Sequence, residues 1–126
     1  MENTAKLFAD DCKLYSEVNN IRDCVLLQRD LDIFSAWSRN WLLRFNKDKC
    51  VALRIREKVP FTYYMEGTAL ENVSDQKDLG IIISDDLKPS KHISTIVRKA
   101  NQRCGMIRRC FTDLNPLKVS ILYKSI

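Results

Sequence analysis

Two adjacent carboxylates, Asp10 and Asp11, are the first residues in the chain whose type and spacing could do chemistry. They lie between the apolar stretches Lys6–Phe8 and Cys12–Tyr15, and this pattern predicts two short strands joined by a tight turn. Hard divalent cations prefer oxygen ligands, so carboxylates at the tip of a hairpin could hold such ions. Two ions about 4 Å apart activate an attacking hydroxyl and stabilise a leaving phosphate oxygen. An ordinary solvated turn is the alternative interpretation.

Cysteine and histidine give little support for other kinds of catalysis. The chain has five cysteines, no two of them spaced as Cys-x-x-Cys, and we interpret them as reduced thiols rather than zinc ligands. His92 is the one histidine in the sequence, and we expect it to be a polar residue at the start of a helix. The three glycines stand far apart and form no phosphate-binding loop.

Positive charge gathers in the last third of the 126 residues. Residues 88–126 carry nine basic side chains and one acidic side chain, Asp113, whereas residues 1–87 carry 12 basic and 15 acidic side chains. Such asymmetry favours a polyanionic partner for the C-terminal segment, and nucleic acid is the partner that we expect. A solvated helix face is the alternative interpretation.

The sequence has no pattern typical of a membrane span or a secretion signal. Apolar runs stay far below the ~20 residues that cross a bilayer. The N-terminal sequence MENTAKLFADD lacks a basic region followed by an apolar one. We therefore expect an intracellular protein, nuclear or cytoplasmic and not secreted, with no membrane partner.

An amphipathic helix is predicted over Ile21–Leu43, with Asn19 or Asn20 as its N-cap. Its apolar stripe, which we expect to pack against the core, consists of Cys24, Leu27, Leu31, Phe34 and Trp41, widened by Trp37. The two tryptophans could stack on bases, but their place in the stripe favours the core.

Four short apolar stretches follow this helix and predict strands. They are Val51–Ile55, Phe61–Met65, Leu70–Val73 and Leu79–Ile83. The connections between them are too short for helices, which favours a small antiparallel sheet. We expect Asp85 and Asp86 to form a turn that leads into the next helix.

A long basic helix is predicted over Lys91–Phe111. At about 100° per residue, one face collects the apolar side chains Ile93, Val97, Ala100, Cys104, Ile107 and Phe111. The candidate phosphate-binding residues on its other faces are Lys91, Arg98, Lys99, Arg103, Arg108 and Arg109. A further helix is predicted to begin near Pro116, and we expect the chain to stop part-way through it.

The segment Phe8-Ala9-Asp10-Asp11 resembles the (Phe/Tyr)-Ala-Asp-Asp hairpin of reverse transcriptases. Further segments follow in the order seen in reverse transcriptases of non-LTR retrotransposons of the LINE-like, jockey or CR1 type. They are Trp37–Trp41 at a helix end, Leu43–Cys50 with an Asn-x-x-Lys-Cys pattern, and Lys77–Ile81 followed by Asp86-Leu87 and His92-Ile93. The resemblance extends from about Ala5 to Ile126.

The resemblance implies an α+β fold. Residues 1–87 would be part of a polymerase palm, with antiparallel strands and a packing helix, and residues 88–126 would begin a helical thumb. Asp10 would bind a catalytic Mg²⁺, and Asp11 would support the metal or the primer end. Lys49 would lie near the departing pyrophosphate, where a lysine donates a proton or neutralises charge. A surface lysine before a strand is the alternative for Lys49.

The resemblance also implies contacts with nucleic acid. Leu79–Ile83 would belong to the region that grips the primer. The basic helix would follow an RNA template–DNA primer duplex through its phosphates, without sequence preference.

One element of the family pattern has no counterpart in the sequence. The family places a second essential aspartate on a strand upstream of the hairpin, whereas the only acid before Asp10 is Glu2. Asp85 and Asp86 follow a different strand and fit a turn better than a ligand role. Two carboxylates from one hairpin make a poor two-metal site, so we expect the chain alone not to extend a primer.

Binding of a deoxynucleotide is expected only if the remaining palm and the fingers are supplied. The alternatives are a non-enzymatic nucleic-acid-binding module and a decayed relic without a selected function.

Overall fold

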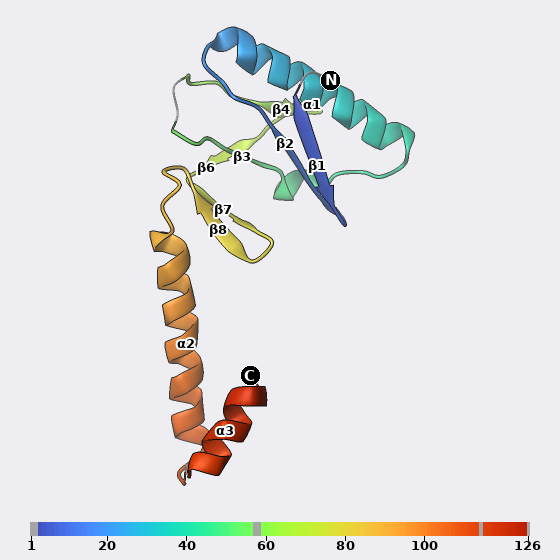
Figure 1. Ribbon diagram of the computed structural model, residues 1–126. Coiled ribbons are helices and arrows are strands. Elements are labelled where there is room, and N and C mark those ends of the chain that lie inside the picture. The colour runs from blue at the N-terminus through green and yellow to red at the C-terminus, as the bar shows by residue number, and fades with distance from the viewer. Residues whose placement is uncertain (1–2, 57–58, 114, 126) are drawn as a thin grey trace. The chain divides into compact units, whose positions relative to one another are not determined.

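The computed structural model describes residues 3–56, 59–113 and 115–125 of the chain. They form two compact units, Met1–Lys88 and Pro89–Ile126. The first unit holds all the described strands and one long helix, and the second holds two helices (Figure 1). This mixture agrees with the predicted α+β class. No helix in the described part of the chain is long and apolar enough to cross a membrane.

The predicted N-terminal hairpin is confirmed. Strands β1 (Thr4–Phe8) and β2 (Asp11–Tyr15) pair antiparallel, with Phe8 opposite Asp11. The turn therefore consists of Ala9 and Asp10, and Asp11 is already the first residue of β2. Ala9 has a φ of 52°, a left-handed conformation that is uncommon for a residue with a Cβ atom.

Helix α1 (Ile21–Asn40) begins where the sequence predicts it. The Asn20 side chain accepts a hydrogen bond from the Asp23 backbone N–H at 3.0 Å. The Asp23 carboxylate in turn accepts one from the Asn20 backbone N–H at 3.2 Å. This reciprocal capping box satisfies two N–H groups that a helix start otherwise leaves unpaired. The helix ends at Asn40, before the predicted Leu43.

The core of the first unit lies between α1 and β4 (Tyr64–Met65). Its buried apolar side chains are Cys24, Leu31, Phe34 and Met65. The Phe34 ring stacks on Trp37 and Phe45, with ring centroids 5.5 and 5.0 Å apart. Burial raises the pKa of Tyr63 to about 12, and a hydrogen bond with Cys24 acts in the same direction.

The prediction that Trp37 and Trp41 lie in the core is wrong. Trp41 is 66% exposed because α1 ends at the residue before it, so the chain no longer follows the helical stripe. Trp37 lies at the edge of the stripe, with one side against Phe34 and 39% of its surface exposed.

The prediction of a small antiparallel sheet is confirmed only in part, because the strands form separate two-stranded pairs and one of the described pairs is parallel. Strands β3 (Val51–Leu53) and β6 (Glu71–Val73) pair in parallel, with Val51 opposite Glu71. The segment between them contains a second hairpin, formed by β4 and β5 (Thr68–Ala69). This hairpin lengthens the connection, so the chain returns to β3 and runs in the same direction.

A third hairpin closes the first unit. Strands β7 (Asp75–Asp78) and β8 (Ile81–Ser84) pair antiparallel around Leu79 and Gly80, which have φ values of 47° and 86°. Two consecutive left-handed residues are typical of a type I′ turn. The predicted strand Leu79–Ile83 therefore starts two residues too early. Strand β7, with the sequence DQKD, has no apolar pattern and was not predicted.

The second unit consists of α2 (Ser90–Cys110) and α3 (Pro116–Ser125). Both helices agree with the predicted ones. Pro89, the N-cap of α2, makes no side-chain capping bond, whereas Asn115 accepts a hydrogen bond from the Lys118 N–H at 2.9 Å before α3. Neither helix has a buried residue among those that the structure describes.

Candidate active site and nucleic-acid interface

Asp10 and Asp11 lie at the exposed tip of the β1–β2 hairpin. Asp10 is the second residue of the turn, and Asp11 is paired with Phe8 at the start of β2. Successive side chains of a strand point to opposite faces. Cys12 is half-buried, so its neighbours Asp11 and Lys13 lie on the opposite, exposed face of β2. Lys13 forms an ion pair with Asp78 of β7.

These two carboxylates offer the oxygen ligands that a divalent cation prefers. Across residues 3–56, 59–113 and 115–125, however, the structure brings no three His, Cys, Asp or Glu side chains together as a metal-binding group. The chemistry of the pair thus suits Mg²⁺ as part of a ligand set, but it does not complete a two-ion site.

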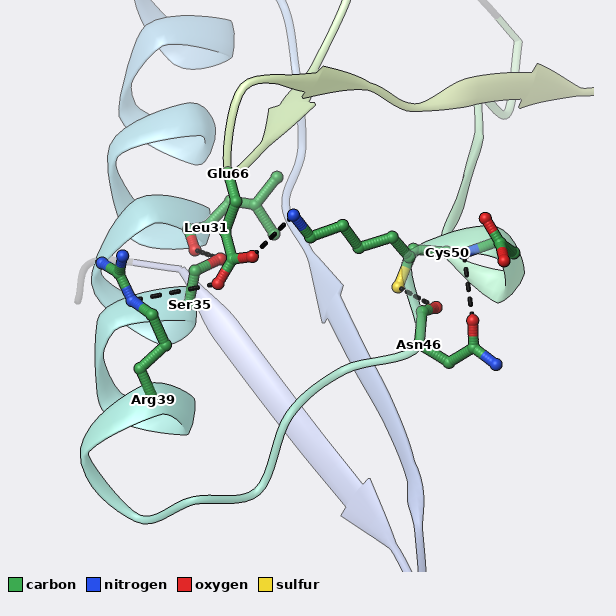
Figure 2. A network of polar contacts seen from close by, with 8 residues as sticks. Leu31, Ser35, Arg39, Asn46, Cys50 and Glu66 are labelled. Carbon is green, nitrogen blue, oxygen red and sulfur yellow. Dashed lines mark hydrogen bonds and ion pairs between the residues drawn. The ribbon is translucent and has the colours of Figure 1, made fainter.

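Lys49 ends a short 3₁₀ turn, η1 (Lys47–Lys49), that the preceding Asn46 builds (Figure 2). The Asn46 side chain accepts a hydrogen bond from the Asp48 N–H at 3.1 Å. The Asn46 carbonyl accepts bonds from the Lys49 N–H at 3.1 Å and from the Cys50 thiol at 3.2 Å. The outer residues of the Asn-x-x-Lys-Cys pattern therefore fix the turn that carries Lys49. Sequence analysis missed this role, although asparagine is a favoured capping residue.

Cys12 of β2 and Cys50, which follows η1, are free, half-buried thiols. Burial raises the pKa of both thiols, and the charge of Cys50 raises the pKa of Cys12 further. Lys49 itself is exposed, and within the described residues no ion pair joins it to Asp10 or Asp11.

A polar network around Glu66 joins the β4–β5 turn to α1 and to η1 (Figure 2). The sequence did not predict this network. Glu66 lies in the β4–β5 turn, with a φ of 49°. Its carboxylate lies 2.8 Å from Lys47 Nζ and 3.8 Å from Arg39 Nε. The hydrogen bond from Lys47 lowers the pKa of Glu66, and the charges of Arg39 and Arg44 add to that shift.

The other end of the same hairpin is bound to α1. The Gln28 side chain donates to the Tyr64 carbonyl and accepts from the Tyr64 N–H, each at 2.8 Å. Its amide thus pairs with the backbone of β4 as a neighbouring strand would. Together, Gln28 and Glu66 fix the hairpin to α1 and to the turn that carries Lys49.

Asp85 and Asp86 form a turn after β8, as the sequence predicts. The Asp86 side chain accepts a hydrogen bond from the Lys88 N–H at 2.9 Å. The Asp85 N–H donates to the Ser74 carbonyl at 2.9 Å, and the Asp85 carbonyl accepts from the Arg56 N–H at 3.0 Å. His92 lies half-buried in the first turn of α2, as expected.

The basic side chains of α2 divide into two groups. Arg98, Arg108 and Arg109 line one open groove of about 870 Å³ along the helix. The other residues that line it are Ser94, Val97, Asn101, Gln102 and Gly105. Lys91, Lys99 and Arg103 lie outside this groove. Since α2 contains no acidic residue, its polar side chains form a surface suited to phosphates.

Sequence analysis found the cations of the groove but missed its neutral hydrogen-bonding residues. Ser94, Asn101 and Gln102 recur at intervals that keep them on one side of a helix, near Arg98. That spacing could have identified them.

Two relatives come from Drosophila melanogaster. A probable RNA-directed DNA polymerase from transposon BS is 29% identical over 106 residues, which cover 80% of this chain and 12% of that protein. The RNA-directed DNA polymerase from the mobile element jockey is 26% identical over 125 residues, 94% of this chain and 14% of that protein. No protein-family model and no solved structure matches the chain. The resemblance to reverse transcriptases of non-LTR elements is thus confirmed, because most of this chain is similar to a short part of two such polymerases.

Proposed function

We propose that the chain is a segment of the RNA-directed DNA polymerase of a retrotransposon. It would contribute the back half of the palm (residues 1–87) and the beginning of the thumb (residues 88–126). The observation that carries the proposal is the tight hairpin with Asp10 in its turn and Asp11 beside it, in a chain similar to two such polymerases.

Within the complete polymerase, Asp10 and Asp11 would be ligands of Mg²⁺, which stabilises charge in phosphoryl transfer. Lys49, held by Asn46 and Cys50, would neutralise charge on the departing pyrophosphate. Because the described residues do not complete the carboxylate set, we assign no catalytic step to this chain alone.

The groove of α2 would bind the RNA template–DNA primer duplex. Its arginines would contact phosphates, and the neutral side chains would donate to phosphate or sugar oxygens. Such contacts hold a duplex without reading its sequence, and the affinity falls steeply with salt.

Charge reversal on α2 tests this binding. We expect the variant Arg98→Glu/Arg108→Glu/Arg109→Glu, which reverses the three arginines of the groove, to bind a labelled RNA–DNA hybrid at least about 100-fold more weakly at 0.15 M salt, because three phosphate contacts are lost. The measurement is fluorescence anisotropy, with circular dichroism to verify the fold. The matched control, Arg22→Glu/Arg29→Glu/Lys77→Glu, reverses three exposed charges of the first unit. Equal losses in both variants would contradict a role specific to α2.

Primer extension tests the catalytic part of the proposal. With Mg²⁺ and a poly(rA)–oligo(dT) duplex, we expect no extension by the folded chain. Extension that disappears in Asp10→Asn would mean that the chain, or an assembly of it, completes the carboxylate set. Such a result would contradict our assignment of inactivity to the chain alone.

A non-enzymatic nucleic-acid-binding module is the second candidate, and the groove of α2 favours it. It predicts duplex binding that survives Asp10→Asn, with Mg²⁺ having no effect on the affinity beyond that of ionic strength. If the chain is instead a polymerase segment, Mg²⁺ should strengthen the binding of a hybrid with a recessed primer end by the unsubstituted chain. Mg²⁺ should not strengthen this binding in Asp10→Asn.

A further inference from the structure

Gly105 lies in the interior of α2, where a glycine weakens a helix relative to an alanine. The position does not need a glycine for its backbone, because Gly105, in contrast to Gly67 and Gly80, has no positive φ. It does not need one for packing either. Apart from the adjacent residues and the backbone of α2 itself, no described atom lies within 4 Å of the place that a Cβ atom would occupy. The folded chain alone therefore does not account for this glycine.

The residues that surround Gly105 on the helix surface all line the groove of α2. Positions three and four residues apart are neighbours on the surface of a helix. On the N-terminal side of Gly105 these positions hold Asn101 and Gln102, and on the C-terminal side they hold Arg108 and Arg109. All four line the groove of about 870 Å³ together with Gly105. The glycine thus leaves helical backbone bare between two amides and two guanidinium groups.

The four side chains around Gly105 are accessible and have no other partner in the described part of the chain. Each of them is exposed. Over residues 3–56, 59–113 and 115–125, none of the four takes part in a side-chain hydrogen bond or ion pair. Since α2 contains no acidic residue, its arginines are not neutralised within the helix. A ligand can therefore use all four groups.

These groups offer two kinds of hydrogen bonding. Guanidinium groups only donate, and they bind phosphate oxygens well. The amides of Asn101 and Gln102 both donate and accept. A ribose 2′-hydroxyl also donates and accepts, and it is the group by which a protein distinguishes RNA from DNA. A ribose with its neighbouring phosphates therefore presents the groups that match both halves of this lining.

We propose that an RNA strand approaches α2 most closely at the bare backbone of Gly105. The amides of Asn101 and Gln102 would bind a 2′-hydroxyl, and the two arginines would bind the adjacent phosphates. A side chain at position 105 would hold the strand away from the helix. This assignment rests on the proposed binding of an RNA–DNA hybrid by the groove, and it adds a preference for the strand that carries 2′-hydroxyls.

The first experiment measures how tightly the unsubstituted chain binds three labelled duplexes of one sequence, by fluorescence anisotropy. The duplexes are an RNA–DNA hybrid, a DNA duplex, and a hybrid whose RNA strand carries 2′-fluoro groups. The fluoro groups keep the geometry of the RNA strand but remove the hydroxyl donor. We expect the 2′-fluoro hybrid and the DNA duplex to bind about fivefold more weakly than the hybrid, because a hydrogen bond to the hydroxyl is lost.

Gly105→Ala separates binding from the stability of the helix. Because alanine favours a helix, this variant should have a stronger helical circular-dichroism signal than the parent chain. It should nevertheless bind the RNA–DNA hybrid about tenfold more weakly, because the added methyl group fills space that the strand would occupy. The matched control is Cys104→Ala, which favours the same turn of α2 from an exposed position outside the groove. Its affinity for the hybrid should equal that of the parent chain.

Asn101→Ala tests the contact with the hydroxyl. It should weaken the binding of the RNA–DNA hybrid about fivefold, because it removes one hydrogen-bonding amide. Binding of the DNA duplex, which has no 2′-hydroxyl, should stay as in the parent chain. The preference for the hybrid should therefore disappear in this variant.

The outcomes distinguish this assignment from the function on which it rests. Equal affinities of the parent chain for the three duplexes, or undiminished binding of the hybrid by Gly105→Ala, would overturn the assignment and leave duplex binding by α2 in place. A 2′-fluoro hybrid that binds as tightly as the unmodified one would also overturn it, because the groove would then recognise only the shape of the duplex. If the folded chain bound none of the duplexes, both the assignment and the proposed role of α2 would be wrong.

Discussion

The two units of the chain hold themselves together in different ways. The first unit buries apolar side chains of α1 and β4 and reinforces them with the Gln28 and Glu66 contacts. In the second unit, no described residue of α2 or α3 is buried, and basic side chains outnumber acidic ones nine to one over residues 88–126. The first unit thus has a buried core, whereas the described side chains of α2 and α3 in the second unit stay accessible to solvent.

The difference shows what helical periodicity can and cannot predict. Both α1 and α2 carry an apolar stripe at the spacing of a helix face. In α1 the stripe is buried at Cys24, Leu31 and Phe34, whereas in α2 Ile93 and Val97 are 53% and 51% exposed. Periodicity therefore identifies residues that share a face, but only the rest of the fold decides whether that face is covered.

The largest expected effect is on the core of the first unit. Phe34→Ala should lower the free energy of unfolding by about 3 kcal/mol, because it removes a buried ring that stacks on Trp37 and Phe45. Phe111→Ala, which truncates a 42% exposed ring after α2, should change it by less than about 0.5 kcal/mol. Urea unfolding followed by tryptophan fluorescence suits this comparison, since both tryptophans belong to the first unit.

If Phe111→Ala destabilised the tryptophan transition as much as Phe34→Ala, the two units would share one cooperative core. The contrast drawn between them would then be wrong.

Much of the local structure could be predicted from short-range signals. Asn20 and Asp23 mark the start of α1, and the Ala9-Asp10 turn marks the first hairpin. The parallel pairing of β3 with β6 could not be predicted, because it depends on how the intervening hairpin docks on α1. Strand β7 was not predicted because its sequence, DQKD, is polar. It forms a strand by pairing with the apolar strand β8.

In the candidate site, too, features set by the local sequence could be predicted, whereas contacts between distant segments could not. The positions of Asp10 in a turn, Asp11 at the start of β2 and Lys49 at the end of η1 follow from their neighbours in sequence. The contacts of Glu66 with Lys47 and Arg39 join segments that are distant in sequence, so no local sequence pattern predicts them.

A smaller effect is expected at the helix caps, where the two units also differ. Asn20→Ala should destabilise the first unit by about 1 kcal/mol, because it removes the cap of α1. Pro89→Ser should instead increase the helical circular-dichroism signal of α2, which lacks a side-chain cap. A loss of helical signal in Pro89→Ser would mean that the rigid backbone of proline matters more at this position than a capping bond.

The smallest effect is expected at Glu66 and concerns pH. The ion pair with Lys47 holds the pKa of Glu66 below its ordinary value of 4.5 in the folded chain. A carboxyl group with a lowered pKa stabilises the fold above that ordinary value, and this contribution is lost as the pH falls through the lowered pKa. Glu66→Gln should therefore reduce the Tm of the first unit slightly at pH 7, and this reduction should shrink progressively as the pH falls below 4.5.

The matched control for Glu66→Gln is Glu71→Gln, which alters an exposed carboxylate of β6 without an ion pair among the described residues. Its Tm difference from the parent chain should not vary with pH in the same window. Because Glu66 is exposed, its ion pair is screened by salt, and the Tm difference at pH 7 should shrink between 0.05 and about 0.5 M salt. A Tm difference that persists at both low pH and high salt would mean that Glu66 acts through the geometry of the β4–β5 turn. The hairpin would then be fixed to α1 by Gln28 and by packing, and the charges around the Lys49 turn would be free to face a phosphate instead.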